Sequence, residues 1–321
     1  MIYADIGSLS AMENFGCEMY FATEAGLSDT VFLLWSTTPT VMLGKYQNAL
    51  EEIDRTYVEK QGITVIRRMS GGGTIYTDPG GLQFSYIVPD SSPSIDFAAF
   101  VTPVTRALSA MGLDAAADGR NDILVSGKKV SGNAQYKIKG ATVHHGSLLF
   151  DTDLSALTRA TTPKPYKITS KSIASVRDRV TNIREHLPHD MSLAAFRSAL
   201  LLALCGSTEP YPLTDEVRER IRVLGQEHYG ASVWETGPKY EITKICHLPG
   251  GTMEFALSMK NGRIMDCRVS GDFFASVNGD EIASCLLGQP LSEPELTTAL
   301  SPLSGKVFSI SPAQIAHTLA E

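Results

Sequence analysis

The sequence lacks the features that mark membrane-spanning, secreted and disulfide-stapled proteins. It holds no apolar run close to the roughly 20 residues that span a bilayer. The first residues show neither a basic flank nor an apolar core, so we see no secretory signal peptide. The five cysteines are irregularly spaced and form no C-x-x-C motif. We therefore expect a cytoplasmic protein with reduced thiols, no membrane partner and no zinc or disulfide framework.

Positive charge is also scarce overall. Lysine and arginine number 28 against 35 aspartate and glutamate residues, and the net charge of −7 argues against a general nucleic-acid binder. The exception is residues 128–184, where seven lysines and four arginines stand against three aspartates. A basic stretch on an acidic protein suits an anionic ligand or an acidic protein partner, although solvated loop lysines without a partner would give the same pattern.

Segments rich in β-branched and aromatic residues predict strands in the first half of the chain. They cover residues 31–35, 40–44, 63–66, 74–77, 82–88, 123–125, 128–130 and 144–150. Apolar periodicity and polarity predict helices over residues 51–60, 97–111, 192–205 and 214–228. Thr214 is the expected N-cap of the last of these helices.

A change of pattern near residues 230–240 predicts a domain boundary, and the chain length allows two domains, residues 1–235 and 236–321. In the second domain, alternating apolar residues flank Asn261-Gly262, which predicts a hairpin with a two-residue turn. The alternating residues are Met253, Phe255, Leu257 and Met259 before the turn and Met265, Cys267 and Val269 after it. Capping boxes that begin at Ser292 and Ser311 predict short helices near the end of the chain.

The most informative feature is a loop with three consecutive glycines in the stretch RRMSGGGTIYTDPG, residues 67–80. Glycine allows the backbone to curl so that successive N–H groups point at one anion. A second glycine-containing loop, GKKVSG at residues 127–132, adds lysines. Together the loops predict a site for a nucleotide phosphate or a mixed anhydride made from one. The glycine loop matches neither the Walker motif nor G-x-G-x-x-G, and alone it could be a plain hairpin turn.

These motifs resemble the lipoate–protein ligase family of the biotin and lipoate ligase superfamily, and the similarity covers most of the chain. VFLLWSTTPTVMLGKYQN is similar to the family's opening strand pair, RRMSGGGTIYTDPG to its lipoate-binding loop and GRNDILVSGKKVSGNAQ to its lysine motif. HHGSLLF resembles the strand that follows, and KSIASVRDRVTNI resembles the adenylate-side loop. From Trp234 onward the chain resembles the accessory domain of the long members.

The resemblance implies an α/β (α+β) fold. A mixed, mainly antiparallel sheet with flanking helices would form the large catalytic domain, and a small α+β domain would follow. It also implies a two-step reaction in which lipoate and ATP, with Mg, give lipoyl-AMP and pyrophosphate. A lysine of an acceptor lipoyl domain then takes the lipoyl group and releases AMP. Octanoate is an expected second substrate, and the implied acceptors are subunits of 2-oxoacid dehydrogenases or the glycine-cleavage H protein.

The resemblance also assigns roles to individual residues. Lys129 would be the catalytic cation that bridges the lipoate carboxylate and the α-phosphate, whereas Lys128 alternates to the other strand face and is expected in solvent. Asp122 is the candidate Mg ligand. Trp35, Val41 and Leu43 are candidate walls for the lipoyl tail or plain core. The residues expected to bind ATP and the adenylate are Arg68, Ser70, Gly71, Gly72, Gly73, Thr74, Ile75, Tyr76, Asn121, Asp122 and His145.

Several alternatives stay open at this point. Ile75 and Tyr76 could be strand core, and Asn121 with Asp122 could serve an Asx turn. Octanoyltransferases of the same superfamily use a cysteine nucleophile, but no cysteine lies between Cys17 and Cys205. The Gly-Arg-Gly-Arg loop of biotin–protein ligases is absent as well. The remaining alternatives to a ligase are an ATP-independent octanoyl or lipoyl transferase and a catalytically silent lipoate-binding paralogue.

Overall fold

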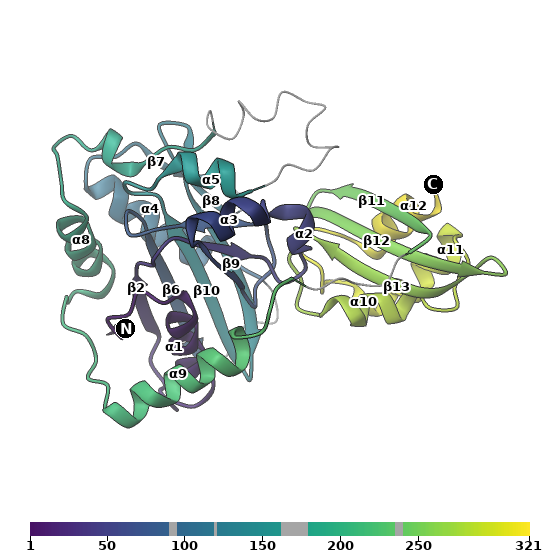
Figure 1. Ribbon diagram of the computed structural model, residues 1–321, viewed down its shortest axis with the longest axis horizontal. Coiled ribbons are helices and arrows are strands. Elements are labelled where there is room, and N and C mark those ends of the chain that lie inside the picture. Colours follow the sequence, from purple (N-terminus) through teal and green to yellow (C-terminus); the bar gives the residue numbers. More distant parts are fainter. Residues whose placement is uncertain (90–94, 119–120, 162–178, 235–239) are drawn as a thin grey trace. The chain divides into compact units, whose positions relative to one another are not determined.

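The computed structural model describes residues 1–89, 95–118, 121–161, 179–234 and 240–321, and the chain divides into two compact units (Figure 1). The first unit comprises Met1–Leu43, Leu50–Arg68 and Thr74–Val233, and the second comprises Gly44–Ala49, Met69–Gly73 and Trp234–Glu321. Two short segments that lie early in the sequence thus group with the C-terminal residues. Among the described helices, none has the length and apolar character to cross a bilayer.

The first unit is built on a seven-stranded sheet in the order β1-β2-β6-β10-β9-β8-β7. Its strands are β1 Ile2–Ala4, β2 Val31–Trp35, β6 Leu82–Pro89, β7 Ala115–Ala117, β8 Asp122–Val125, β9 Lys128–Ile138 and β10 Ala141–Leu148. Only the β1–β2 pair of this sheet is parallel, because short turns join most of the others. A smaller sheet in the order β4-β3-β5 carries β3 Thr40–Leu43, β4 Thr64–Arg67 and β5 Ile75–Thr77. The predicted mixed, mainly antiparallel sheet is confirmed.

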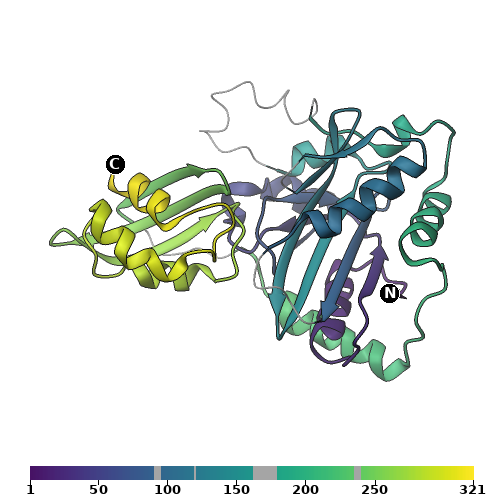
Figure 2. The ribbon, with the colours of Figure 1, turned by 180° about the vertical axis from the view of Figure 1, so that it is seen from behind.

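Helices lie on both faces of the large sheet (Figures 1 and 2). They are α1 Ala11–Thr23, α4 Ala98–Ala110, α8 Leu193–Cys205 and α9 Asp215–Tyr229, with the shorter α2 Ala49–Glu52, α3 Arg55–Gln61 and α5 Leu154–Ala160. α1 packs against the sheet and against α9, and two glycines allow the helices to approach closely. A Cβ atom on Gly16 would lie 2.3 Å from the Ile221 carbonyl oxygen, and one on Gly225 would lie 2.6 Å from that of Met12.

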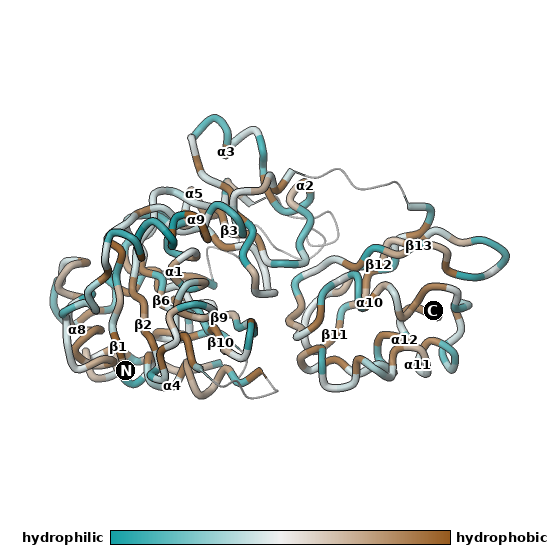
Figure 3. Tube along the Cα trace, turned by 90° about the horizontal axis from the view of Figure 1, so that it is seen from below, coloured by the Kyte–Doolittle hydropathy of each residue, from teal (hydrophilic) through white to brown (hydrophobic). Residues whose placement is uncertain are grey.

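Hydrophobic residues follow the central strands of the first unit. All five residues of β2, VFLLW, are buried, which explains the continuous hydrophobic colour of this strand in Figure 3. A strand with helices on both sides buries both of its faces, so its sequence shows no alternation. The predicted strand at residues 31–35 is confirmed with these bounds.

The second unit is a three-stranded antiparallel sheet, β11 Ile242–Leu248, β12 Gly251–Lys260 and β13 Arg263–Gly271, packed against short helices. The helices are α10 Gly279–Leu286, α11 Glu293–Leu300 and α12 Pro312–Ala320. Asn261 and Gly262 have positive φ angles of 53° and 71°, so the predicted two-residue hairpin turn is confirmed. Tyr46 belongs to the core of this unit, where its ring stacks on Phe273 with centroids 4.3 Å apart.

Three details differ from the sequence-based predictions. The helix expected over residues 51–60 is two helices, because Ile53 forms a β-bridge with Thr161 and Asp54 caps a new helix by accepting from the Tyr57 N–H. Met265 is exposed, since a bulge in the β12–β13 ladder gives its expected buried position to Ile264. The capping box at Ser292 is wrong, because its hydroxyl bonds the Glu295 carboxylate, whereas the box at Ser311 is confirmed.

Candidate functional site

The hairpin of β8 and β9 carries the predicted lysine motif. Ser126 and Gly127 form its turn, with positive φ angles of 50° and 77°. The strand register shifts between Ile123 and Leu124, so that Leu124 pairs with Lys129 and Ile123 pairs with Ser131. The additional residue on β9 is Val130, whose carbonyl accepts from the Leu149 N–H at 2.8 Å. β-Bulges of this kind redirect side chains near functional sites, and here the bulge adjoins Lys129.

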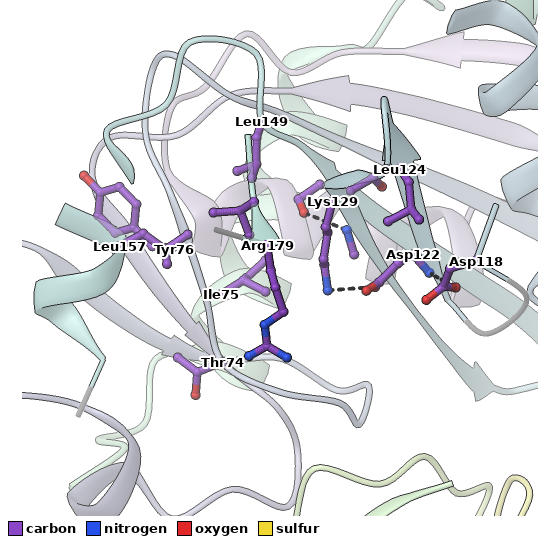
Figure 4. Close-up of a pocket in the computed structure, with 15 residues that line it drawn as sticks. Thr74, Ile75, Tyr76, Asp118, Asp122, Leu124, Lys129, Leu149, Leu157 and Arg179 are labelled. Atoms are coloured by element: carbon purple, nitrogen blue, oxygen red, sulfur yellow. Dashed lines mark hydrogen bonds and ion pairs between the residues drawn. The ribbon is translucent and has the colours of Figure 1, made fainter. Parts of the chain in front are cut away.

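A pocket of about 600 Å³ opens beside this hairpin in the first unit (Figure 4). Its size falls within the range of roughly 300–1,000 Å³ that is common for small-molecule sites. The lining residues come from β5, β8, β9, β10 and α5 and from the segments next to them. They are Thr74, Ile75, Tyr76, Asp118, Asp122, Leu124, Gly127, Lys129, Ser131, Gly132, Ser147, Leu149, Leu157, Arg179 and Val180.

Lys129 and Asp122 form an ion pair in this pocket. The Nζ atom of Lys129 lies 2.7 Å from Oδ1 of Asp122, and the side chains are 38% and 20% exposed, so both can be reached by a ligand. Gly132 pairs with Asp122 across the ladder, and a Cβ atom on Gly132 would lie 3.2 Å from Lys129 Nζ. The missing side chain at Gly132 therefore gives the lysine room to reach its partner.

The remaining polar groups of the pocket suit an anionic ligand. Arg179 extends its guanidinium into the cavity, and Thr74, Ser131 and Ser147 add hydroxyl groups (Figure 4). Residues next to Arg179 run along β9, since the Thr181 N–H donates to the Lys129 carbonyl at 3.0 Å. The pocket thus combines two cations with hydroxyl donors, which is the chemistry that binds phosphate and carboxylate groups.

A buried network lies directly behind the hairpin. The Asn133 side-chain amide donates to the Asn121 carbonyl at 2.9 Å and to the Ser131 hydroxyl at 3.2 Å, and the Asn121 amide donates to the Asn133 carbonyl at 2.8 Å. Nε2 of His144 lies 3.2 Å from Oδ1 of Asn133. His144 is fully buried, and this burial together with neighbouring His145 lowers its pKa well below the usual value.

A second buried cluster surrounds Glu18, on α1. Its carboxylate accepts from the Ser85 hydroxyl at 2.5 Å and the Tyr136 hydroxyl at 3.3 Å and contacts Nδ1 of His145 at 3.1 Å. Glu18 is 0% exposed, so these contacts replace water around the carboxylate. Sequence reasoning missed Glu18. Its neighbours Cys17 and Met19 are buried too, and a single acidic residue in a buried segment of a helix was the only available signal.

The predicted site residues divide into three groups. Lys129, Asp122, Thr74, Ile75 and Tyr76 line the pocket together. In the same unit, Asn121 belongs to the buried network and His145 to the Glu18 cluster, and neither is a lining residue. Arg68 is buried as well, donates to the Met42 carbonyl at 3.0 Å, and has its pKa lowered by burial to about 9. The roles of all these residues stay predictions.

The glycine loop itself groups with the second unit. The Gly72 N–H donates to the Phe273 carbonyl at 3.2 Å, and the Ser70 carbonyl accepts from the Lys45 N–H at 2.8 Å. A Cβ atom on Gly71 would lie 2.2 Å from the Phe273 carbonyl oxygen, so a residue without a side chain is needed there. Ser70 is buried, and Gly73 belongs to the same segment.

Other predicted features lie outside the described residues. They are Gly119 and Arg120 of the lysine motif and most of the basic adenylate-side segment, residues 162–178. The structure adds Asp118, Ser131, Gly132, Ser147 and Arg179 to the pocket. Ser131 and Gly132 lie within the quoted lysine motif, and Arg179 within the quoted adenylate-side segment, so their proximity to Lys129 in the sequence or their motif membership was the available signal.

Comparisons with known proteins agree along the whole chain. A model of the lipoyl protein ligase A/B catalytic domain matches residues 10–205, and a model of the bacterial lipoate protein ligase C-terminus matches residues 237–319. Lipoate-protein ligase LplJ of Bacillus subtilis is 37% identical over 303 residues, which cover 92% of this chain and 92% of the relative.

Two solved structures are similar in fold and sequence. The bipartite lipoate protein ligase of Thermoplasma acidophilum, described with its E2 lipoyl domain, matches with a TM-score of 0.65 and 26% identity over 73% of this chain and 94% of that one. A lipoate-protein ligase A bound with ATP matches with a TM-score of 0.59 and 26% identity, over 70% and 93% of the two chains. The chain belongs to the lipoate–protein ligase family.

Proposed function

We propose that this chain is an ATP-dependent lipoate–protein ligase that forms lipoyl-AMP in the pocket beside the β8–β9 hairpin. The observation that carries the proposal is the Lys129–Asp122 ion pair at 2.7 Å inside a cavity of about 600 Å³. The ATP-bound relative and the lipoate ligases of similar sequence support ATP and lipoate as the ligands. The lipoyl group would then pass to a lysine of an acceptor lipoyl domain, with release of AMP.

The first step brings two anions together, since the lipoate carboxylate must attack the α-phosphate of ATP as pyrophosphate leaves. Their mutual repulsion is large unless a cation lies between them. Lys129 can supply that charge, and Asp122 holds its Nζ atom in place before the substrates arrive. A preorganised donor of this kind is worth about 10²–10³ in rate. Arg179 and the hydroxyls of Ser131 and Ser147 would bind the remaining phosphate oxygens.

Magnesium would enter with ATP rather than occupy a cage made by the protein. Within the described ranges, no group of three His, Cys, Asp or Glu side chains could hold a metal ion. Mg²⁺ is often held by substrate phosphates with one or two carboxylates, and it neutralises phosphate charge. Asp118 and Asp122 line the pocket and offer such oxygen ligands, although Asp122 also bonds Lys129. The residues present fit this mode of binding.

The lipoyl chain is proposed to follow one face of β10. Ser147 lines the pocket and His145 lies two residues away on the same face, a separation of about 7 Å along a strand. Phe15 connects this region to Trp35, with ring centroids 5.7 Å from His145 and 5.3 Å from Trp35. The Glu18 cluster and these aromatic rings would form the end of the slot, consistent with the predicted role of His145 as a lining residue.

The acceptor is proposed to be a lipoyl domain of a 2-oxoacid dehydrogenase subunit or the glycine-cleavage H protein. The Thermoplasma relative is described with its E2 lipoyl domain, which supports an acceptor of this class. An acidic acceptor surface would meet the basic stretch of residues 128–184, of which residues 162–178 lie outside the described part. The five cysteines are free thiols, as expected in the proposed cytoplasmic location.

A cysteine-dependent transferase is disfavoured by the pocket. None of the residues that line the described pocket is a cysteine. Cys17 lies on α1, is fully buried, and burial raises the pKa of its thiol, which suppresses the thiolate that such chemistry needs.

The test is lipoate-dependent release of pyrophosphate from ATP and Mg²⁺, measured for the wild type and for Lys129→Ala. We expect release that requires lipoate and a kcat reduced by at least about 10²-fold in the variant. Lys128→Ala is the matched control, because Lys128 is the exposed neighbour on the same strand and should leave kcat unchanged. No release by the wild type, with or without a lipoyl acceptor domain present, would refute the proposal.

A further inference from the structure

We infer that His144 and Asn133 are positioning residues for the adenylation step: they hold the loop that carries Asp122 and the bulged segment that carries Lys129. The inference rests on the proposed function for its activity readout. It assigns a role to a histidine that sequence reasoning regarded as ordinary core. Neither residue lines the pocket, so both act through the Lys129–Asp122 pair.

The hydrogen-bond pattern fixes which atoms donate. The Asn133 Nδ2 atom donates to the Asn121 carbonyl and to the Ser131 hydroxyl, so Oδ1 is the oxygen that faces His144. His144 must therefore donate from Nε2. Its Nδ1 atom is buried without a hydrogen-bond partner among the described residues, as expected for a neutral ring protonated on Nε2. The imidazole thus has a single function as donor to Asn133.

Asn133 in turn fixes both sides of the hairpin. On one side, the Asn121 carbonyl accepts from the Asn133 backbone N–H at 2.8 Å and from its side-chain amide at 2.9 Å. The next residue along the chain is Asp122. On the other side, the same amide bonds Ser131, which lies between the bulged Val130 and Gly132, over which the Lys129 side chain extends. One side chain therefore bonds the segments of both members of the ion pair.

The surroundings of the pair are shaped to keep it in place. The His144 ring stacks on Phe100 with centroids 4.6 Å apart and an interplanar angle of 17°. A Cβ atom on Gly146 would lie 2.3 Å from Asn133 Oδ1, so the glycine leaves the space that this oxygen occupies. Asn133 and His144 are 3% and 0% exposed, so water cannot replace a lost bond without rearrangement.

The experiment compares three variants in the lipoate-dependent pyrophosphate assay. His144→Phe keeps an aromatic ring against Phe100 but removes the donor to Asn133. His144→Gln keeps an amide N–H that can donate. Asn133→Asp keeps the acceptor for His144 and loses the donor to Asn121 and Ser131, and it decides the question if His144→Phe does not fold.

We expect kcat to fall about 10²-fold in His144→Phe and in Asn133→Asp, because displacement of reacting groups by about 1 Å costs that much. His144→Gln should restore kcat to within about tenfold of the wild type, and the KM for ATP should change less than kcat. The matched control is Asn14→Ala. Asn14 is also a buried asparagine, 3% exposed, whose amide donates to two backbone carbonyls, those of Ser8 and Ser10. It should lose stability in urea with an unchanged kcat.

A double variant separates positioning from general loss of structure. If His144 acts through Asp122, His144→Phe should add less than about threefold to the loss already caused by Asp122→Ala, since contacting residues that act as a unit are not additive. Full multiplication of the two losses would overturn the inference. A folded His144→Phe with wild-type kcat would overturn it as well.

Amide hydrogen exchange keeps the inference testable if the wild type releases no pyrophosphate, which would refute the proposed function alone. The amides of residues 121–125 and 128–133 should then exchange at least about tenfold faster in His144→Phe than in the wild type, while Asn14→Ala leaves them unchanged. Unchanged exchange in His144→Phe would overturn the inference.

Discussion

Glu18 offers the clearest test of the energetics of the buried region. The carboxylate is 0% exposed and takes part in hydrogen bonds with Ser85, Tyr136 and His145. Glu18→Ala would leave these three polar groups buried without their partner and would leave a cavity in the space of the carboxylate. Glu18→Gln would keep one oxygen acceptor while placing two N–H donors where the second oxygen had accepted.

The expected loss follows from these contacts. Each buried donor that loses its acceptor costs about 1–3 kcal/mol, and water entering the cavity recovers part of that. The range for removing one partner of a buried ionic contact, about 3–5 kcal/mol, therefore applies to Glu18→Ala. Glu18→Gln should cost about 1–2 kcal/mol, because some of the hydrogen bonds remain.

Urea unfolding followed by circular dichroism measures both changes, provided that the m-value stays constant. Glu13→Ala is a control on the same helix. Its carboxylate lies 3.7 Å from Arg222 at a partly exposed position, and pairs of this kind contribute about 0–1 kcal/mol.

A loss below about 1 kcal/mol in Glu18→Ala would refute the reasoning, since it would mean that the cost of burying the carboxylate equals what its partners return. Equal losses in the alanine and glutamine variants would refute the part of the argument that depends on hydrogen bonds and would leave charge as the dominant factor.

Two further predictions concern stability. Gly16→Ala should destabilise the protein by about 1–3 kcal/mol through overpacking against Ile221; an increase in the urea midpoint, as helix propensity alone predicts, would contradict the close α1–α9 approach. Because the pKa of buried His144 lies well below 6.5, the unfolded chain binds an additional proton below that pH. The free energy of unfolding should therefore fall by up to about 1.4 kcal/mol per unit as pH decreases below 6.5, and His144→Gln should lose this one-proton slope in urea titrations at pH 5–7.

Local signals in the sequence predicted much of the fold. The Asn261-Gly262 turn, the buried strand at residues 31–35 and the N-cap at Thr214 are all observed, because each depends on a few neighbouring residues. The errors arose where distant contacts decide the conformation. Residues 51–60 form two helices because Ile53 pairs with Thr161, which lies far along the chain. Met265 is exposed because of a bulge that the alternation pattern cannot reveal.

The candidate site shows the same division. Lys129, Asp122 and the residues Thr74 to Tyr76 were predicted from motifs and meet in one pocket. The contribution of Asp118 and Ser147 depends on which strand ends the sheet brings together, and no local pattern encodes it. Glu18 and His144 act through partners more than ten residues away, Glu18 through His145 and His144 through Asn133. Such pairings become visible only once the strand register is known.

The inclusion of Gly44–Ala49 and Met69–Gly73 in the second unit limits how the gene could be divided. A protease that cuts between residues 235 and 236 would separate the covalent halves without separating the folded units, since Tyr46 would still fill the core around Phe273. A C-terminal fragment expressed alone would lose that ring and expose roughly 150–250 Å² of surface that an aromatic side chain normally covers. Complementation between two separately produced fragments should therefore require the N-terminal piece to supply Tyr46.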